Sequence, residues 1–474
     1  MRKNIYNIFD FGAVSDVEKL QTAKIQAAID ECFLSGGGEV VVPEGDYLTA
    51  CIRLRSNVTL HLEKNAHLIG SKNARDYDIK TDGIEPYKDE DRTVSVWAPP
   101  QGYENVSNGS DNMVMSGKAD ILDNGDDFEF FNKPLSSWNN GIIKAIDAYD
   151  IAVICDDGAY IDGRDCFDET GEEHYRGPFA INMHRCNNIR FEGVHIKNSG
   201  NWAFALFDSR NVIVEKALVE AGHDGVHMTS CDNVTIRECE FYCGDDCVAG
   251  IDNLNVVVRE CILNTACSAM RFGGTNALIE HCKAYGPAKF MFRGSLTDEE
   301  KRSGASAGSG HRHNMLGFFT YYSDYTREIR ETPGNIKIKN CTVENADRFL
   351  HYNFSGNEPW QRNKPLASIE FENITATNVK HPITAYGDKT CPISLTIKNC
   401  NIHLSDDREI LPLMYLCNAE MVDLSNTIVE NFKNDVLIKR WDENGNIKTD
   451  GFVCEDFSGE CWVVAGESFV CEAI

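Results

Sequence analysis

The sequence lacks a surplus of positive charge. Its 46 lysine and arginine residues stand against 73 aspartate and glutamate residues, which gives a formal net charge of -27. Nucleic acids and anionic membranes bind basic surfaces, so neither is expected as a partner. The same deficit weighs against a polyanionic substrate, unless a local group of basic residues binds it.

The sequence also lacks a long apolar run and a recognisable secretory leader. No stretch of about 18 apolar residues occurs, so no membrane span is expected. The opening residues 1–10 are too polar for the apolar part of a signal peptide. We therefore expect a cytoplasmic protein whose 19 cysteines are reduced thiols, whereas a leader already removed would indicate secretion.

A short motif recurs about every 22 residues. In each copy an asparagine precedes alternating apolar and polar residues, and successive asparagines are separated by 23, 22 and 22 positions. These asparagines are Asn188, Asn211, Asn233 and Asn255, with later copies at Asn335 and near Ala367. A second row follows the strands at Cys239, Cys261 and Cys282, with Cys341 and Cys400 in equivalent Lys-Asn-Cys phrases.

This period predicts an all-β, right-handed parallel β-helix with about 22 residues per coil, because alternation without helical periodicity indicates several short strands per repeat. Leucine-rich repeats are excluded because their leucine frame is absent. Stacked coils bring equivalent side chains into rows about 4.8 Å apart. The asparagine rows should occupy left-handed turns with amides bonded along the stack, and the cysteine rows should face the interior.

The organisation expected is a single β-helix domain over residues 1–474. Residues 1–38 should form an N-terminal cap, with an amphipathic helix over Gln21–Phe33 that ends before three glycines. Residues 73–140 lack the repeat and are interpreted as a loop-rich insertion, and 298–314 as a second loop. The coils are expected to end near residue 440, which leaves 440–474 as a C-terminal extension.

Asp224, Asp245 and Asp246 are the candidate catalytic residues. The 21 positions between Asp224 and Asp245 are nearly one coil, so the two are expected side by side, with Asp246 in the turn beyond. Crowded carboxylates raise one another's pKa values, which supplies the protonated acid and the ionised base of glycoside hydrolysis. A calcium site or solvated turn aspartates would use the same Gly-Asp-Asp phrase.

From residue 6 to about 295 the chain resembles the polygalacturonase family of glycoside hydrolases. The resemblance rests on Tyr6–Ala13, Gly36–Tyr47, Asn57–Glu63, Asp162–Gly163 and Asn198–Trp202, and on Asp224–Gly225 followed by Gly244–Cys247 at the family's spacing. It implies an inverting hydrolase, without a cofactor or metal, that acts on a pectin-related or other plant or microbial glycan. In it Asp245 would be the general acid, while Asp224 and Asp246 hold and activate the water.

The sequence departs from the family around the sugar. Ala266-Cys267-Ser268 stands where the family has Gly-His-Gly, and Met291-Phe292-Arg293 is the nearest phrase to its Arg-Ile-Lys. The hydrolytic trio is therefore expected to act on a substrate other than polygalacturonate. Candidates for substrate binding are His223, Arg271, Arg293 and Trp202, each weighed against a surface or structural role.

Two other functions remain open from the sequence. A polysaccharide lyase or epimerase on the same scaffold would use Arg271 as a base and aspartate-rich turns for an ion. A non-catalytic carbohydrate-binding β-helix would need no paired acids. For a hydrolase, the insertion and the second loop would block one end of the cleft, which favours exo cleavage of oligosaccharides. The oligomeric state stays open.

Overall fold

The computed structural model describes residues 4–77, 140–303, 314–324, 327–355, 359–408, 410–442, 445–455, 457 and 459–464. Its contacts group the chain into two compact units. Among the described residues, unit 1 comprises 4–77, 140–245 and 289–303, and unit 2 comprises 246–288 and 314 onward. A single domain over the whole chain stays a prediction, and most of the expected insertion lies outside the described residues.

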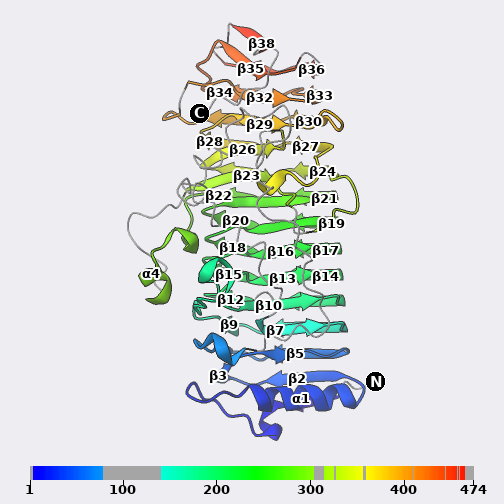
Figure 1. The fold of residues 1–474 in the computed structure, drawn as a ribbon, viewed down its shortest axis with the longest axis vertical. Helices are drawn as coiled ribbons and strands as arrows, with labels where there is room; N and C mark the ends of the chain where they lie inside the picture. The colour runs from blue at the N-terminus through cyan, green and yellow to red at the C-terminus, as the bar shows by residue number, and fades with distance from the viewer. Residues whose placement is uncertain are drawn as a thin grey trace. The chain divides into compact units, whose positions relative to one another are not determined.

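Unit 1 is a stack of coils in which each turn contributes one strand to each of three parallel rows (Figure 1). The first row holds β2 (Gly38–Val42), β5 (Val58–Leu62), β8 (Tyr149–Cys155), β11 (Asn187–Glu192), β14 (Arg210–Glu215) and β17 (Asp232–Arg237), with β1 (Ile5–Asn7) beside β2. The second holds β4 (Ile52–Arg53), β7 (Gly141–Ile146), β10 (Phe179–His184), β13 (Phe204–Phe207) and β16 (Val226–Thr229). The third holds β3 (Gly45–Thr49), β6 (Ala66–Gly70), β9 (Tyr160–Asp162), β12 (His195–Lys197), β15 (Leu218–Ala221) and β18 (Glu240–Cys243). All printed pairings are parallel, which confirms the predicted parallel β-helix.

Helices are few and short in unit 1. The α1 helix covers Thr22–Leu34 beside β2 (Figure 1) and buries Ile25, Ala28, Ile29 and Cys32, which confirms the predicted capping helix. Short 3₁₀ turns are η1 (Ile8–Phe11), η2 (Ala74–Asp76), η6 (Glu172–His174) and η7 (Arg293–Ser295). The segment after η7 forms α4 (Asp298–Ser303), where the sequence predicted only a loop.

Unit 2 repeats the same architecture. Its elements are β19 (Val248–Arg259), β20 (Ile262–Thr265), β21 (Ser268–Glu280), β22 (Lys283–Tyr285), β23 (Met315–Tyr321), β24 (Gly334–Lys339), β25 (Thr342–Glu344), β26 (Ala346–Asn353), η8 (Pro359–Gln361), β27 (Ser368–Glu372), β28 (Thr375–Val379), β29 (Ile383–Tyr386), β30 (Ile393–Lys398), β31 (Asn401–Leu404), β32 (Met414–Cys417), β33 (Ala419–Asp423), β34 (Ile428–Glu430), β35 (Val436–Arg440), β36 (Asn446–Lys448), β37 (Val453–Cys454) and β38 (Glu460–Val464). The long strands β19 and β21 pair in parallel through a bulge between Gly250 and Asn253.

The asparagine rows lie where the sequence predicted them. Asn211 and Asn233 in unit 1 have φ of 53° and 56°, and Asn276 in unit 2 has φ of 58°. The Asn233 amide donates to the Asn211 side-chain oxygen at 3.2 Å, and Asn335 donates to Asn276 at 2.7 Å. Each amide thus joins its turn to the turn of the preceding coil.

The cysteine rows are interior, as predicted. Cys239 in unit 1 and Cys261, Cys282, Cys341 and Cys400 in unit 2 are all buried. A thiol is small and weakly polar, so it fills the inside of a turn without demanding a strong hydrogen bond.

The expectation that the coils end near residue 440 is wrong. The strands β36, β37 and β38 pair in parallel with β33, β34 and β35, so the stack continues to Val464. Two of these strands have only two or three residues and no asparagine motif, so the side-chain pattern did not reveal them. Backbone pairing alone extends the stack there.

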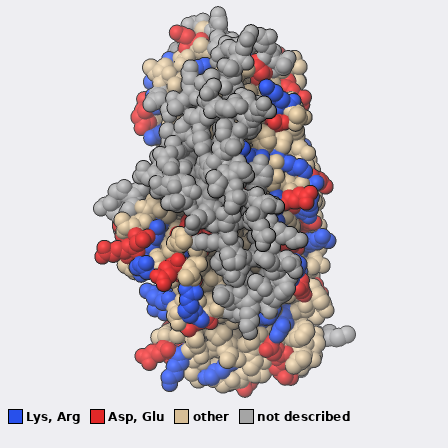
Figure 2. Space-filling model, viewed as in Figure 1, with Lys and Arg blue, Asp and Glu red and all other residues tan. Residues whose placement is uncertain are grey.

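The surface charges are mixed. On the face drawn in Figure 2, acidic and basic side chains of the described residues alternate over the coils. Within the described residues, no helix is long and apolar enough to cross a membrane.

Candidate active site

The turn after the third strand row carries two of the predicted aspartates in unit 1. In β15 and β18, Ala221 pairs with Cys243, a step of 22 residues. Continuing this register places Asp245 opposite His223, and Asp224 one residue further along. The expectation that Asp224 and Asp245 occupy equivalent positions is therefore wrong by one residue, because the local coil has 22 residues rather than 21.

Two glycines allow a second segment to pack against these turns. A β-carbon on Gly244 would lie 1.9 Å from the carbonyl oxygen of Met291, and one on Gly222 would lie 2.4 Å from Cγ of Arg293. Neither position tolerates a side chain without movement of the backbone or of a buried arginine. The segment Met291–Arg293, the nearest counterpart of the family's basic phrase, thus lies directly on the carboxylate-bearing turns.

Asp224 is buried and is held by a histidine that sequence reasoning missed. The Nδ1 of His227 lies 2.7 Å from Oδ2 of Asp224. The His227 ring stacks on Trp202 with centroids 3.6 Å apart and planes 4° apart. Trp202 itself packs into a buried cluster with Phe179, so its ring orients His227, which in turn orients the carboxylate. A role of Trp202 in sugar stacking stays a prediction.

Asp245 is also buried and is paired with an arginine outside the repeat. Nη2 of Arg176 lies 3.1 Å from Oδ2 of Asp245. Arg176 ends the loop that contains η6, which a bridge between Phe167 and Arg176 closes. The sequence held no signal for this residue, because the loop does not share the coil period.

His223 connects to the same arginine and is fully buried. Nη1 of Arg176 lies 3.1 Å from Nδ1 of His223. Burial, with the charges of Arg176 and Arg293, holds the pKa of His223 well below its ordinary value, so the ring is neutral. Because a guanidinium only donates, Nδ1 must accept and the proton stays on Nε2. This buried Nε2–H has no hydrogen-bond partner among the described residues and is available to a ligand.

Asp246 opens unit 2 and has its own partners there. The backbone N–H of Ser268 donates to its Oδ1 at 2.8 Å, and Nη1 of Arg271 lies 3.6 Å from its Oδ2. The Arg271 guanidinium lies over the rings of Tyr322 and Trp360, at 4.2 and 4.8 Å from their centroids. Arg271 thus combines the ion pair weighed from the sequence with a partly exposed position beside the candidate catalytic carboxylate.

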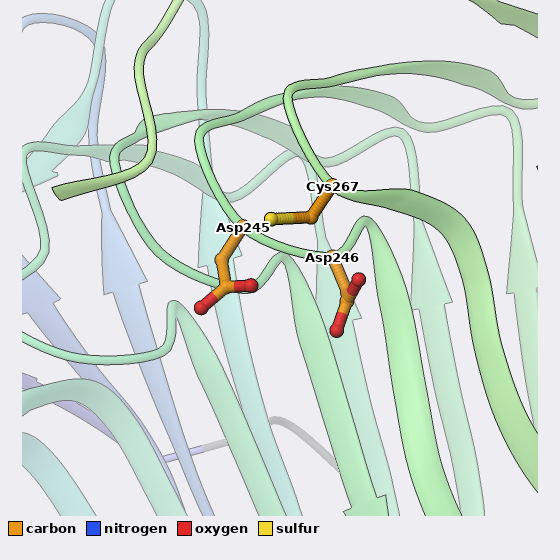
Figure 3. Close-up of side chains that lie close together, drawn as sticks. All are labelled: Asp245, Asp246 and Cys267. Carbon is orange, nitrogen blue, oxygen red and sulfur yellow. The ribbon is translucent and has the colours of Figure 1, made fainter. Parts of the chain in front are cut away.

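Cys267 lies beside Asp246, with its sulfur within 4.8 Å of a carboxylate oxygen (Figure 3). With the preceding residue, Asp245, these side chains form a group that could hold a metal ion. Two carboxylates and one thiol mix donors that suit different metals and fall one short of a tetrahedral zinc set. We assign no metal to them.

Arg293 does not continue the row of Arg271, as the sequence suggested. The strand partner of Arg271 is Thr320 in β23, whereas Arg293 begins the 3₁₀ turn η7 in unit 1. The chain leaves the coil between β22 and β23, which breaks the row. Arg293 is fully buried, with Nη1 3.0 Å from Oδ1 of Asp165 and Nη2 donating to the Lys301 carbonyl at 3.0 Å.

Glu172 is a further buried acid that the sequence did not single out. Burial raises its pKa to about 8, aided by the charges of Glu173 and Asp224 and opposed by Arg176 and a hydrogen bond from Asn201. Glu172 is therefore largely protonated at neutral pH. It keeps one negative charge away from Asp224.

We expect Glu172→Gln to flatten the pH dependence of stability. The folded pKa of about 8 exceeds the ordinary 4.5, so the folded state holds a proton that the unfolded state loses. The stabilisation from the protonated acid is complete below pH 4.5 and is lost as pH rises through about 8. Thermal midpoints measured between about pH 5 and 8 should fall less in the glutamine variant. Parallel curves for the two proteins would contradict a protonated Glu172.

The comparisons with known proteins agree with this geometry. Residues 127–268 match the family model described as glycosyl hydrolases family 28. A probable polygalacturonase of Vitis vinifera is 25% identical over 260 residues, which cover 52% of this chain and 44% of the relative. The mannuronan C5-epimerase AlgE2 of Azotobacter vinelandii is 30% identical over 145 residues, 31% of this chain and 13% of the relative. The chain spans less than half the length of these curated relatives.

A solved structure shows the same fold. The exopolygalacturonase from Thermotoga maritima aligns with a TM-score of 0.58 at 16% identity, over 96% of this chain and 93% of that one. Parallel coils with buried aspartates at a turn define a β-helix of the pectinase type. More particularly, the chain is polygalacturonase-like, and its family 28 segment contains Asp224, Asp245 and Asp246.

Proposed function

We propose that the protein is an inverting glycoside hydrolase that cleaves an O-glycosidic bond of a pectin-related or other plant or microbial oligosaccharide. One observation carries this proposal. The three aspartates of the family 28 segment are all buried, and each is held by a different partner: His227, Arg176, or the Ser268 amide. Buried carboxylates kept in fixed orientations suit proton transfer better than calcium binding or solvation.

The roles follow from the family resemblance and these partners. Asp245 donates a proton to the leaving oxygen, and Arg176 fixes the orientation of its carboxyl group through Oδ2. Asp224 and Asp246 hold and activate the attacking water. His227 orients the first of these, and the Ser268 amide orients the second. In an inverting reaction the acid and the base act in one step, so both orientations must hold together.

Contacts in unit 1 support exo cleavage. The segment leading into α4 folds onto the loop that contains η6, with Lys301 Nζ 4.3 Å from the centroid of the Tyr175 ring. The Arg302 guanidinium lies 4.1 Å from the centroid of the Phe167 ring. These contacts close the structure beside Arg176 and His223, which favours a substrate that enters by one chain end.

A panel assay tests the proposal. Pectic and neutral oligosaccharides are incubated with the protein, and new reducing ends are measured together with the anomeric configuration of the first product by NMR. We expect at least one oligosaccharide to release a sugar with inverted configuration. Retention of configuration, or no new reducing end on any glycan of a broad panel, would contradict an inverting hydrolase.

The second candidate is an epimerase or lyase, which the identity to AlgE2 favours. Both reactions need a base to remove the C5 proton of a uronate. Arg271 is the basic residue beside Asp246, but its pairing with that carboxylate and with two rings stabilises its charged form. Ultraviolet absorbance from an unsaturated sugar, or exchange of the C5 hydrogen with solvent, would favour this function over hydrolysis.

A further inference from the structure

Two polar side chains in unit 2 are buried with none of their hydrogen bonds made. His351 and Asn353 lie two residues apart on β26, so they share one face of the strand. Both have an exposed fraction of 0%. The two ring nitrogens of His351 and the amide oxygen and nitrogen of Asn353 have no hydrogen-bond partner. Buried polar groups are normally paired, so this cluster indicates a site completed by something else.

The neighbouring coils give the site polar and aromatic borders. On one side His351 pairs with Thr320 of β23, and on the other with Thr384 of β29. Asn353 pairs with Tyr386, whose ring meets Trp441 edge-on at 5.7 Å. Amide and imidazole groups next to aromatic rings are typical of sugar-binding sites, where rings cover the apolar face of the sugar.

The site lies in line with the candidate catalytic residues of unit 2. Arg271, Thr320 and His351 are strand partners in one row. Two strand spacings separate Arg271 from His351, which is about 10 Å. That separation places the pair one or two sugar units away from the carboxylate that Arg271 contacts.

The charge state of the pair selects the ligand. Burial, with the nearby charge of Arg348, holds the pKa of His351 well below its ordinary value, so the ring is neutral. A neutral imidazole presents one donor and one acceptor, and a carboxamide presents both kinds as well. Neighbouring hydroxyl groups donate and accept in the same way. A carboxylate only accepts, and would leave two of the four groups facing lone pairs.

We infer that His351 and Asn353 form a distal subsite that binds one sugar unit of the glycan through two neighbouring hydroxyl groups. As a subsite for a substrate, it rests on the proposed function. Because no solvent reaches the pair in this structure, binding requires adjacent side chains to move aside. The subsite would make affinity depend on the length of the oligosaccharide.

The test compares binding of short and long probes to matched variants. Dimers and tetramers of galactose and of galacturonate are titrated calorimetrically into the wild type, Asn353→Leu and His351→Leu. We expect the wild type to bind one tetramer roughly tenfold more tightly than the matching dimer, and each variant to lose this preference. Their thermal midpoints should hold or rise, because an apolar side chain removes unpaired polar atoms.

Tyr352→Phe is the control, because Tyr352 lies on the same strand with its side chain on the opposite face. Its hydroxyl accepts the Leu366 N–H at 2.8 Å, so this variant should lose stability and keep the length preference. A wild type without a tetramer preference, or variants that retain it, would overturn the subsite and leave the pair as a site for ordered water. Tetramer-selective binding without new reducing ends would instead refute the hydrolase and leave the subsite standing.

Discussion

Asp245→Asn is expected to lower the hydrolysis rate by about 10²–10⁴, the usual contribution of a general acid. The amide has the shape of the carboxyl group and still offers an oxygen to Arg176 Nη2, so the buried contact at 3.1 Å can persist. It cannot deliver a proton to the leaving oxygen. The rate is measured as new reducing ends on the best oligosaccharide of the panel, with the thermal midpoint recorded for each protein.

Asp224→Asn and Asp246→Asn should cost nearly as much, and double variants little more, because residues that act as one unit are not additive. Asp252→Asn is the matched control. Asp252 is buried in unit 2 and pairs with Nε of Arg330 at 2.8 Å, so this variant should lose stability and retain turnover. An Asp245→Asn protein with near-normal turnover would remove the proposed mechanism.

Polygalacturonate is expected to be a poor substrate, cleaved at least about tenfold more slowly than the best glycan of the panel. The basic residues around the site already hold acids. Arg176 pairs with Asp245, Arg293 with Asp165, and Arg271 with Asp246. A substrate carboxylate that enters this environment needs its own charge-assisted partner, and a buried unpaired charge costs several kcal/mol. The net charge of -27 adds a weaker repulsion, which salt screens.

The measurement is a side-by-side rate comparison of polygalacturonate, galacturonate oligomers and neutral oligosaccharides at two salt concentrations. A single uronate at a chain end could still be accepted through the His223 Nε2–H, so galacturonate dimers should be cleaved faster than the polymer. Rapid cleavage of polygalacturonate within the chain would show that the missing Gly-His-Gly and Arg-Ile-Lys phrases matter less than their chemistry suggests.

Features that repeat with the coil were predictable from the sequence. The rows of Asn211, Asn233 and Cys239 announce themselves because stacking brings equivalent residues together in every turn, and the capping helix has its own period. The register at the active site was missed by one residue. A count of 21 between two aspartates looks like a coil, but the strand pairing of Ala221 with Cys243 sets the true step at 22.

Features supplied by irregular segments were not predictable. Arg176 and Glu172 come from a loop outside the repeat, and nothing in their spacing points to Asp245 or Asp224. His227 follows Asp224 by three residues and was visible, but only the 2.7 Å contact shows that it holds that carboxylate. His351 and Asn353 emerged because their polar atoms are buried without partners, which no sequence pattern records.

The asparagine ladder has a consequence for how such chains change over generations. Each rung joins its own turn to the next through one amide contact, as between Asn211 and Asn233, and does not depend on more distant coils. Duplication of one repeat would therefore insert a layer that its neighbours accept with the contacts they already make. Each added layer lengthens the stack by about 4.8 Å, close to one sugar. A lineage could thus adjust the length of glycan it recognises one monosaccharide at a time.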